Sequence, residues 1–538
     1  MTARSSNLLS SALSFRVCLE TLVTAVAAAY SSFDSPSPMR CLLRLLLCAV
    51  VVLSIPSAHA RPNIVFILAD DLGYGETGFN GQRRIRTPNL DRLAHRGTVL
   101  SRHYAGNAVC APSRAVLMTG RNPGHACVRD NRDVGGGEQT PLPAGTATIA
   151  TVLRSAGYRT GLFGKWGLGS MDSSGSPLKQ GFDVFVGLTS QWQAHSHYPA
   201  FIWNNLEKLA LRNGPEGVPG HGAFPVGADP QDPSSYTAFT GREFSSDRFV
   251  EGAETFIEAS AGKPFFLYYA SPLPHVSLQA PEKECLDYRG VFPEDPPFTP
   301  ANPASYVPNR TPRVTYAAMI TRLDTEVGRI VSALEKTGVA NNTLVVFSSD
   351  NGPTHNVGGV DTAFFNSAGG LRGLKGSLYE GGVREPTLVC WPGVVPEGCR
   401  NPMLSGFEDW LPTFVELSGA KMDAAYDGES LVPTLHGKDQ IRHTPLYREF
   451  PGYGHQQAIW QGPWKAIRTG MLARARESGL PVTELYQLTT DPSESQNVAA
   501  QFPDVVRELE EKMKAARDPH AAFPLAGVDA GTEFAIKR

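Results

Sequence analysis

The stretch Asn63-Ile-Val-Phe-Ile-Leu-Ala-Asp-Asp71 is an apolar run that ends abruptly in two carboxylates. An uninterrupted apolar run of this length is typical of a strand that is buried on both faces of a parallel sheet. The pattern recurs at residues 158–163, 264–270 and 343–349, and each run is followed by polar residues. Segments with helical spacing separate the runs, at residues 90–97, 148–156, 248–260 and 316–338. The sequence therefore predicts an α/β fold with a mixed, mainly parallel central sheet flanked by helices.

The pattern changes at about residue 440. Residues 457–469 predict a β-hairpin, residues 484–488 a further strand, and residues 503–516 an amphipathic helix. We therefore expect a catalytic α/β domain over residues 61–440 and a smaller C-terminal α+β subdomain with an antiparallel sheet over residues 441–538. The Pro- and Gly-rich stretches 213–240 and 292–312 are expected to be loops over the site.

The first 60 residues have the features of a secretory signal. Met39, Arg40 and Arg44 precede an apolar run over residues 45–55, and an Ala-His-Ala sequence ends at Ala60. This order predicts a signal peptide with its true start at Met39 and cleavage after Ala60, and hence a secreted or periplasmic protein. The apolar run is too short for a membrane span, so we expect no stable span after cleavage.

Charge and cysteine content narrow the class of protein. The 538 residues carry a formal net charge of −3, with no basic run of five or more residues, which argues against a nucleic-acid partner. Apart from Cys110, four cysteines follow residue 60, enough for two disulfides in an oxidising compartment. They are Cys127, Cys285, Cys390 and Cys399, of which the last two are close enough in sequence to close a loop.

Cys110-Ala-Pro-Ser-Arg114 is the most informative chemical motif. Pro112 suits the first turn of a helix, so Cys110 is expected at a helix N-terminus, where the helix dipole favours an anion. Arg114 offers a bidentate fork to a tetrahedral oxyanion. On these two residues alone, a buried structural cysteine beside a surface arginine is an equal alternative.

Together with Leu-Met-Thr-Gly-Arg121, this motif resembles the signature of the formylglycine-dependent (type I) sulfatases of the alkaline phosphatase-like superfamily. The resemblance extends from about residue 62 to residue 498. It implies that a formylglycine-generating enzyme converts Cys110 to formylglycine (3-oxoalanine), whose hydrate is the nucleophile. The activity it implies is sulfuric ester hydrolysis of the arylsulfatase type.

The polar residues after the predicted strands include a candidate metal site. Asp70, Asp71, Asp350 and Asn351 offer only oxygen atoms, which suits Ca²⁺ or Mg²⁺ and not zinc. Taken singly, each pair is also a good turn sequence. The resemblance implies Ca²⁺ rather than Mg²⁺, bound by these four residues and by one oxygen of modified residue 110.

Other predicted catalytic residues lie in glycine-flanked or proline-flanked segments. By the resemblance, Lys165 and Lys375 hold the sulfate oxygens, and either Lys375 or His275 protonates the leaving oxygen, with Arg114 offsetting charge. A solvated lysine is the ordinary alternative. Gly167 departs from the family pattern, which has histidine there to assist breakdown of the sulfated intermediate. His195 or His197 is a candidate replacement, and a water or a carboxylate is the alternative.

The substrate is less well defined by the sequence. Tryptophans 192 and 203, Tyr198, His195 and His197 form a cluster that suits stacking on sugar rings, although core packing explains the tryptophans equally well. We expect a sulfated small molecule or, by preference, a sulfated carbohydrate. The alternatives are a phosphate or phosphonate ester hydrolase of the same superfamily and an inactive glycan-binding relative.

Overall fold

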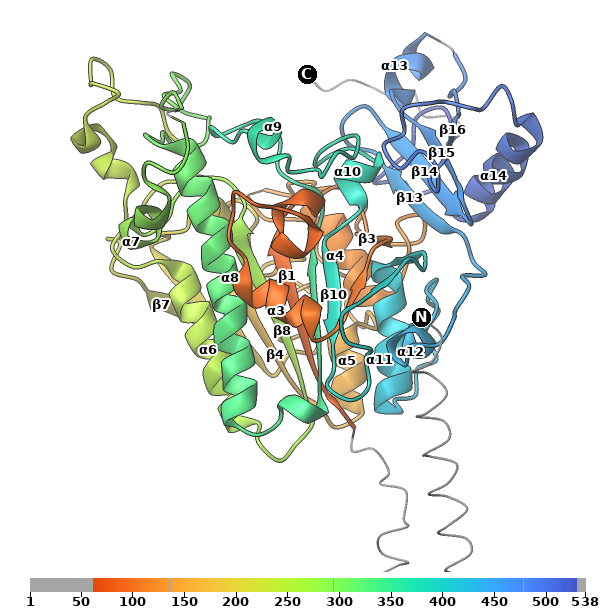
Figure 1. Cartoon of the computed structure of the whole chain (residues 1–538), viewed down its shortest axis with the longest axis horizontal. Helices are drawn as coiled ribbons and strands as arrows, with labels where there is room; N and C mark the ends of the chain where they lie inside the picture. The colour runs from red at the N-terminus through yellow and green to blue at the C-terminus, as the bar shows by residue number, and fades with distance from the viewer. Residues whose placement is uncertain (1–60, 136, 294, 478, 530–538) are drawn as a thin grey trace, which may run out of the picture. The chain divides into compact units, whose positions relative to one another are not determined.

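The central sheet is built from the apolar runs that the sequence predicts. In the computed structural model, which describes residues 61–529 except 136, 294 and 478, they form β1 (Asn63–Asp70), β4 (Arg159–Lys165), β8 (Phe265–Pro274) and β9 (Thr343–Ser349). The strand order is β11-β2-β10-β9-β1-β8-β4-β5-β6-β7 (Figure 1). The strands from β9 to β5 are parallel, and antiparallel pairings extend the sheet on both sides. The predicted fold class is confirmed.

The other strands are short. They are β2 (Thr98–Leu100), β3 (His103–Tyr104), β5 (Val184–Leu188), β6 (Phe201–Asn204), β7 (Glu207–Ala210), β10 (Thr387–Cys390), β11 (Cys399–Asn401) and β12 (Ser405–Gly406). Strands β3 and β12 pair with each other outside the main sheet. The described part of the chain therefore combines one large sheet with small additions.

Helices cover both faces of the large sheet (Figure 1). Val65 and Ile67 of β1 face α3 (Pro88–His95), α6 (Ser245–Ala259) and α8 (Pro312–Lys336). Phe66 and Leu68 face α4 (Cys110–Thr119), α5 (Ile149–Ser155) and α11 (Trp410–Ser418). Burial of one such side chain contributes about 1.5–3 kcal/mol, so the continuous apolar run is required on both faces.

The remaining helices are mostly short. The α-helices are α7 (Glu282–Cys285), α9 (Thr362–Phe365), α10 (Glu380–Val383), α12 (Val432–Leu435), α13 (Met471–Arg476) and α14 (Pro503–Ala515). Short 3₁₀ turns include η3 (Gln193–His195) and η4 (Pro233–Phe239). η4 lies in the first predicted loop, and a β-bridge between His221 and Tyr306 joins that loop to the second.

The C-terminal region contains a separate antiparallel sheet, as predicted. Its strands are β13 (Leu446–Phe450), β14 (Gln456–Gln461), β15 (Trp464–Arg468) and β16 (Glu484–Gln487), in that order. β14 and β15 form the predicted hairpin, and Leu509 and Met513 of α14 pack against the sheet. The boundary at residue 440 remains a prediction.

Three further predictions concern the signal peptide, a membrane span and the disulfides. The predicted signal peptide, with its start at Met39 and cleavage after Ala60, lies outside the described residues. Among the residues that are described, no helix has both the length and the apolar character needed to cross a bilayer. Cys127, Cys285, Cys390 and Cys399 are all free thiols, so the predicted disulfides, including the loop between the last two, are wrong for this structure.

Candidate active site and metal centre

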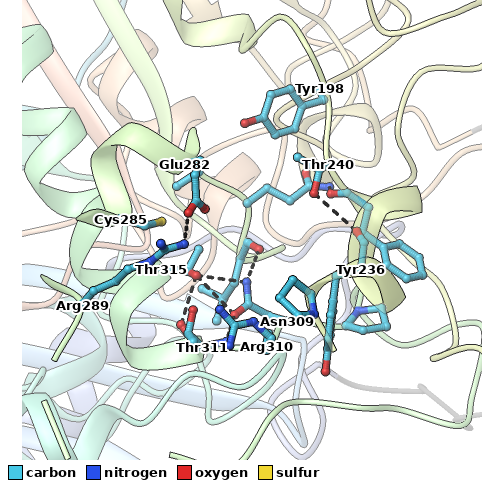
Figure 2. Close-up of a pocket in the computed structure, with 16 residues that line it drawn as sticks. Tyr198, Tyr236, Thr240, Glu282, Cys285, Arg289, Asn309, Arg310, Thr311 and Thr315 are labelled. Atoms are coloured by element: carbon cyan, nitrogen blue, oxygen red, sulfur yellow. Dashed lines mark hydrogen bonds and ion pairs between the residues drawn. The ribbon is translucent and has the colours of Figure 1, made fainter. Parts of the chain in front are cut away.

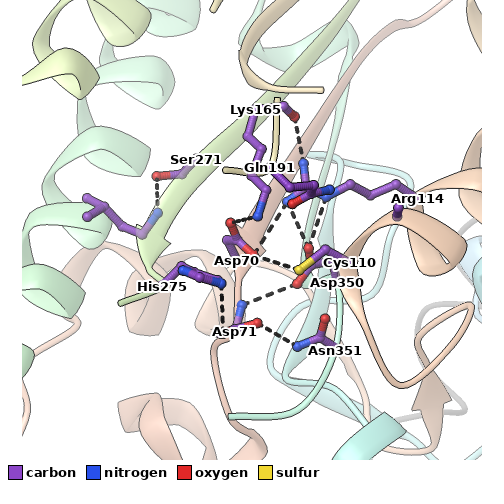
Figure 3. A network of polar contacts seen from close by, with 12 residues as sticks. Asp70, Asp71, Cys110, Arg114, Lys165, Gln191, Ser271, His275, Asp350 and Asn351 are labelled. Atoms are coloured by element: carbon purple, nitrogen blue, oxygen red, sulfur yellow. Dashed lines mark hydrogen bonds and ion pairs between the residues drawn. The ribbon is translucent and has the colours of Figure 1, made fainter. Parts of the chain in front are cut away.

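The site lies where the parallel strands end. β1 lies between β8 and β9, so the carboxyl ends of these three strands meet at one edge of the sheet. That edge carries Asp70 at the end of β1, Asp71 directly after it, His275 after β8, and Asp350 after β9 (Figure 3). Ligand sites of open parallel sheets form in this position because the loops diverge there.

Cys110 is the first residue of α4, as the motif predicts. Its thiol is buried, and Sγ lies 3.5 Å from Asp70 Oδ1 and 3.5 Å from Lys375 Nζ. Burial raises the pKa of this thiol to about 12, although Lys165 and Lys375 oppose the shift. An unmodified Cys110 is therefore a protonated thiol at neutral pH, which is a weak nucleophile.

Three of the predicted metal ligands lie in one buried group with His275, which the sequence predicts as a catalytic residue. Ligand atoms of Asp70, Asp71, Cys110 and His275 all lie within 4.8 Å of one another. Asp350 Oδ1 accepts a hydrogen bond from the Asp71 amide at 3.2 Å. Asp71 has a φ of 66°, a left-handed backbone conformation that is uncommon for a residue with a side chain and typical of functional sites.

The amide of Asn351 supplies a direct test of the predicted cation. Its Nδ2 donates to Asp71 Oδ1 at 2.8 Å, whereas its Oδ1 is buried and has no hydrogen-bond partner among the described residues. A buried acceptor without a partner is costly, and a cation would satisfy it. The donor set of Asp70, Asp71, Asp350 and Asn351 therefore fits a hard divalent cation.

Three cationic side chains face these carboxylates. Arg114 donates from Nε and Nη2 to Asp350 Oδ2, at 3.0 and 2.8 Å, and from Nη1 to the Lys165 carbonyl at 2.6 Å. Lys165 Nζ forms an ion pair with Asp70, and Lys375 Nζ lies 2.8 Å from Asp71 Oδ1. All three positive charges are therefore held by carboxylates that are candidate metal ligands.

These pairings shift the pKa values in opposite directions. Burial alone would raise the pKa of Asp70, but the charges around it, led by Lys165, hold that pKa well below its usual range. Burial opposes the charge of Lys375, but Asp71, Cys110 and Asp70 together outweigh burial and raise the pKa of this lysine well above its usual range. The pKa of Asp350 is raised to about 6, first by burial and then by Asp70.

The three predicted histidines occupy different places. His275 Nε2 lies 3.6 Å from Asp71 Oδ2, and its Nδ1 contacts the Val276 carbonyl. The His195 ring stacks on the His275 ring with centroids 4.9 Å apart, so His195 borders the site. His197 is buried, and its Nε2 contacts the His275 backbone carbonyl at 2.9 Å. The geometry therefore favours a supporting position for His197.

The aromatic residues that the sequence predicts as one cluster lie in different places. Trp192 is 57% exposed and stacks on His221, with centroids 4.3 Å apart. Tyr198 instead packs against Phe244, and Trp203 lies beside Phe201 on an outer strand. Of the predicted cluster, Trp192 therefore presents a partly exposed ring beside His195 and His221.

Several residues near the site are not predicted by the sequence. Tyr306 packs against His275 and His221, with centroids 6.3 and 4.8 Å away. Tyr453 is 64% exposed, and Cδ2 of its ring would lie 2.1 Å from any Cβ at Gly376, the residue after Lys375. An isolated tyrosine in a loop leaves no periodic pattern or motif in the sequence. The sequence feature that could have pointed to Tyr453 is the glycine that follows Lys375.

Gln191 is a further residue that the sequence does not reveal. Figure 3 draws it within the polar network that contains Lys165, Asp70 and Arg114. Its Nε2 would lie 2.1 Å from a Cβ placed on Gly167. The side chain of Gln191 therefore fills the space next to the position where the family pattern has histidine.

The structure also contains a separate cavity of about 340 Å³ (Figure 2). Tyr236 and Phe239 of η4 line it together with Asn309 and Arg310. Gln279 also lines it and accepts a hydrogen bond from the His197 amide at 3.0 Å. None of the predicted catalytic or metal-binding residues lines this cavity.

Comparisons with known proteins agree with this geometry. The sulfatase family model matches residues 62–420, and a model described as N-sulphoglucosamine sulphohydrolase, C-terminal, matches residues 374–519. Arylsulfatase A of Homo sapiens is 32% identical over 525 residues, covering 89% of this chain and 93% of that protein. The N-acetylgalactosamine-6-O-sulfatase of Bacteroides thetaiotaomicron is 29% identical, covering 85% and 93%.

Solved structures show the same relationship. The crystal structure of Ps i-CgsB superposes with a TM-score of 0.68 and 28% identity, covering 85% of this chain and 94% of that one. The phosphonate monoester hydrolase of Agrobacterium radiobacter, at 21% identity and a TM-score of 0.58, shares the fold. The chain therefore belongs to the sulfatase family of the alkaline phosphatase-like fold and is a sulfatase enzyme.

Proposed function

We propose that the protein hydrolyses the sulfate ester of a sulfated carbohydrate, with residue 110 as its nucleophile. The observation that carries the proposal is the position of Cys110 Sγ, 3.5 Å from both Asp70 Oδ1 and Lys375 Nζ. The reacting atom thus lies between carboxylates that suit a cation and ammonium groups that suit an anion.

Two groups complete the proposed site. Formylglycine, made from Cys110 by a formylglycine-generating enzyme, would supply the oxygen of a hydrated aldehyde in place of the thiol. Ca²⁺, favoured over Mg²⁺ because Ca²⁺ accepts more ligands in less regular geometry, would supply positive charge beside that oxygen. The side chains that would hold the cation are Asp70, Asp71, Asp350 and Asn351, together with residue 110.

The two lysines are proposed to bind the sulfuryl oxygens. Lys165 is paired with Asp70 and Lys375 with Asp71, which are both candidate metal ligands. With a divalent cation held by these carboxylates, both ion pairs would be weaker, and the two ammonium groups would be available to an anion. Arg114 donates through two nitrogens to Asp350 Oδ2 and through the third to the Lys165 carbonyl, and so holds the backbone at Lys165 in place.

The leaving oxygen needs a proton, for which two donors are near. The His275 Nδ1–H is directed to the Val276 carbonyl, so a neutral His275 has no proton on Nε2. Lys375 Nζ carries protons whenever it is charged, and it lies beside residue 110. We therefore favour Lys375 as the proton donor and His275 as a contact to the sulfate, with the reverse assignment as the alternative.

Carbohydrate is proposed as the substrate class for two reasons. Trp192 presents an exposed ring beside His195, which suits stacking against the apolar face of a sugar. One similar protein is named N-acetylgalactosamine-6-O-sulfatase, and one similar structure holds a neocarrahexaose. The predicted signal peptide would deliver the enzyme to a secreted or periplasmic location, where it would meet extracellular glycans.

The first test is the mass of the peptide that carries residue 110, from protein made in a host with a formylglycine-generating enzyme. Conversion of CH₂SH to CHO lowers the mass by about 18 units. The converted protein should release inorganic sulfate from sulfated saccharides and from an aryl sulfate, and much less phosphate from matched phosphate esters. Cys110→Ala is the control for activity. Fully converted protein that hydrolyses no sulfate ester would contradict the proposal.

A further inference from the structure

The segment after β4 brings a glutamine into the place of a missing side chain. Gly167 has a φ of 80°, and a Cβ on this residue would meet Gln191 Nε2 at 2.1 Å and Gln191 Cδ at 3.0 Å. Both distances are shorter than any ordinary carbon contact. A side chain at position 167 and the present conformation of Gln191 therefore exclude each other.

Hydrogen bonds hold the backbone of Gln191 in this position. Its backbone N–H donates to Gln139 Oε1 at 3.0 Å, and Gly167 N–H donates to the Thr189 carbonyl at 3.1 Å. The Gln191 side chain is 5% exposed. The two chain segments are thus fixed against each other by the backbone, and the amide of Gln191 is directed into the space beside Gly167.

The Gln191 amide nitrogen has no hydrogen-bond partner within the described part of the chain. Buried polar groups are almost always paired, and an unpaired donor costs free energy in the folded state. Figure 3 draws Gln191 in the network with Lys165, which we propose as a sulfate-binding residue. An anionic oxygen bound at Lys165 would therefore meet an N–H donor that nothing else in the described structure uses.

We propose that Gln191 Nε2 donates a hydrogen bond to a non-bridging oxygen of the bound sulfate ester. This inference rests on the proposed function of the site and adds a substrate-contacting residue to it. An amide carries its N–H donors at every working pH and neither releases nor takes up a proton there. Gln191 therefore takes the space beside position 167 as a binding group and does not replace a histidine in proton transfer.

The test compares two identical substitutions two residues apart. Gln191→Leu removes the donor and keeps similar volume, while Gln193→Leu makes the same chemical change on the neighbouring turn. The Gln193 side chain donates to the Phe201 carbonyl and lies outside the network. A third variant, Gln191→Glu, places a carboxylate oxygen where the amide nitrogen of Gln191 lies. All three are measured with fully converted residue 110.

Loss of a hydrogen bond to a charged group should lower kcat/KM of Gln191→Leu for sulfate esters by roughly 10- to 100-fold. Gln191→Glu should lose more, because its charge repels the sulfate. Calorimetric titration with inorganic sulfate should show weaker binding to Gln191→Leu than to wild type. The unfolding midpoint of Gln191→Leu should stay the same or rise, because an unpaired buried donor has been removed.

Three results would overturn the inference. In the first, Gln191→Leu keeps kcat/KM within about twofold of wild type and binds sulfate equally well. In the second, Gln193→Leu loses as much activity as Gln191→Leu. In the third, the activity loss comes with a lower unfolding midpoint and unchanged sulfate affinity, which indicates a structural role. Failure of the proposed function is distinct, because then wild type itself would not hydrolyse sulfate esters.

Discussion

The imidazole rings of His195 and His221 are joined by a hydrogen bond of 2.8 Å between His195 Nδ1 and His221 Nε2. His221 Nδ1 lies 2.9 Å from the Ala304 carbonyl, which can only accept, so Nδ1 carries the proton of a neutral His221. His221 Nε2 then accepts from His195 Nδ1–H. A neutral His195 is thus fixed with no proton on Nε2, in a ring that stacks on His275.

The first prediction concerns His221 as a positioning residue. His221→Phe keeps a flat ring against Trp192 but removes the acceptor for His195, so the tautomer of His195 is no longer fixed. We expect kcat for a sulfate ester to fall about tenfold with KM nearly unchanged, as for the loss of one orienting hydrogen bond. His221→Gln restores an acceptor oxygen and should recover most of kcat. Equal losses in both variants would show that ring packing, not the hydrogen bond, matters.

The second prediction concerns the exposed ring of Trp192. Trp192→Ala should raise KM for a sulfated oligosaccharide roughly three- to tenfold, because a stacking contact of about 1 kcal/mol is lost. KM for a small aryl sulfate should change little. Steady-state kinetics with both substrates tests this, and Leu206→Ala, which removes another exposed apolar side chain, is the control. A rise in KM for both substrates would argue against a saccharide contact at Trp192.

The third prediction concerns the cation. Three buried carboxylates and the unpaired Asn351 Oδ1 should bind Ca²⁺ in the folded protein only, so Ca²⁺ at 100 times its Kd should stabilise the protein by about 2.7 kcal/mol. Chelation should lower the unfolding midpoint and abolish turnover, and added Ca²⁺ should restore both. Asn351→Leu should weaken Ca²⁺ binding in a calorimetric titration. An unchanged midpoint in chelator and in Ca²⁺ would contradict the assignment.

The fourth prediction concerns a buried charge in the C-terminal sheet. Lys465 Nζ lies 3.1 Å from Glu380 Oε1 and 2.7 Å from Glu494 Oε1, and all three side chains are fully buried. Lys465→Met removes the cation and leaves two carboxyl groups together, so it should cost about 3–5 kcal/mol of unfolding free energy. Lys512→Met breaks a partly exposed pair with Glu508 and should cost about 1 kcal/mol or less. Urea unfolding of both variants checks the contrast.

The fifth prediction concerns pH and His103. Burial, aided by Arg448 and Arg442, lowers the pKa of His103 to about 3 in the folded protein. The unfolded chain binds this proton below about pH 6.5 whereas the folded chain does not, so falling pH favours unfolding. Between about pH 6.5 and 3, His103 should remove about 1.4 kcal/mol of stability per pH unit. The glutamine of His103→Gln cannot titrate, so the urea midpoint of this variant should fall less steeply with falling pH than that of wild type. Equal slopes of urea midpoint against pH would refute the prediction.

Local patterns were sufficient for most of the fold. β1 and β9 appear where continuous apolar runs occur, because a strand covered by helices on both faces must be apolar at every position. Cys110 begins α4 because a proline in the first turn fits the backbone there. Such features depend on neighbouring residues alone, so the sequence is enough to predict them.

Cysteine spacing was a poorer guide. Cys390 and Cys399 are only nine residues apart, yet Cys390 lies buried in β10 while Cys399 is exposed in β11. β2 lies between these two strands in the sheet. Sequence distance does not fix the distance between strands when a third strand inserts between them, so the expected disulfide fails.

The sequence by itself determined the long central strands β1, β4, β8 and β9, the helix start at Cys110 and the carboxylates at the strand ends. Only the tertiary structure decided that Gln191 fills the space beside Gly167, that His221 fixes His195, and that Tyr453 covers Gly376. Strand and helix patterns repeat along the chain because each residue's environment follows from its neighbours. Contacts between irregular loops have no such period, since they arise only when the packed sheet and helices fix where each loop begins and ends.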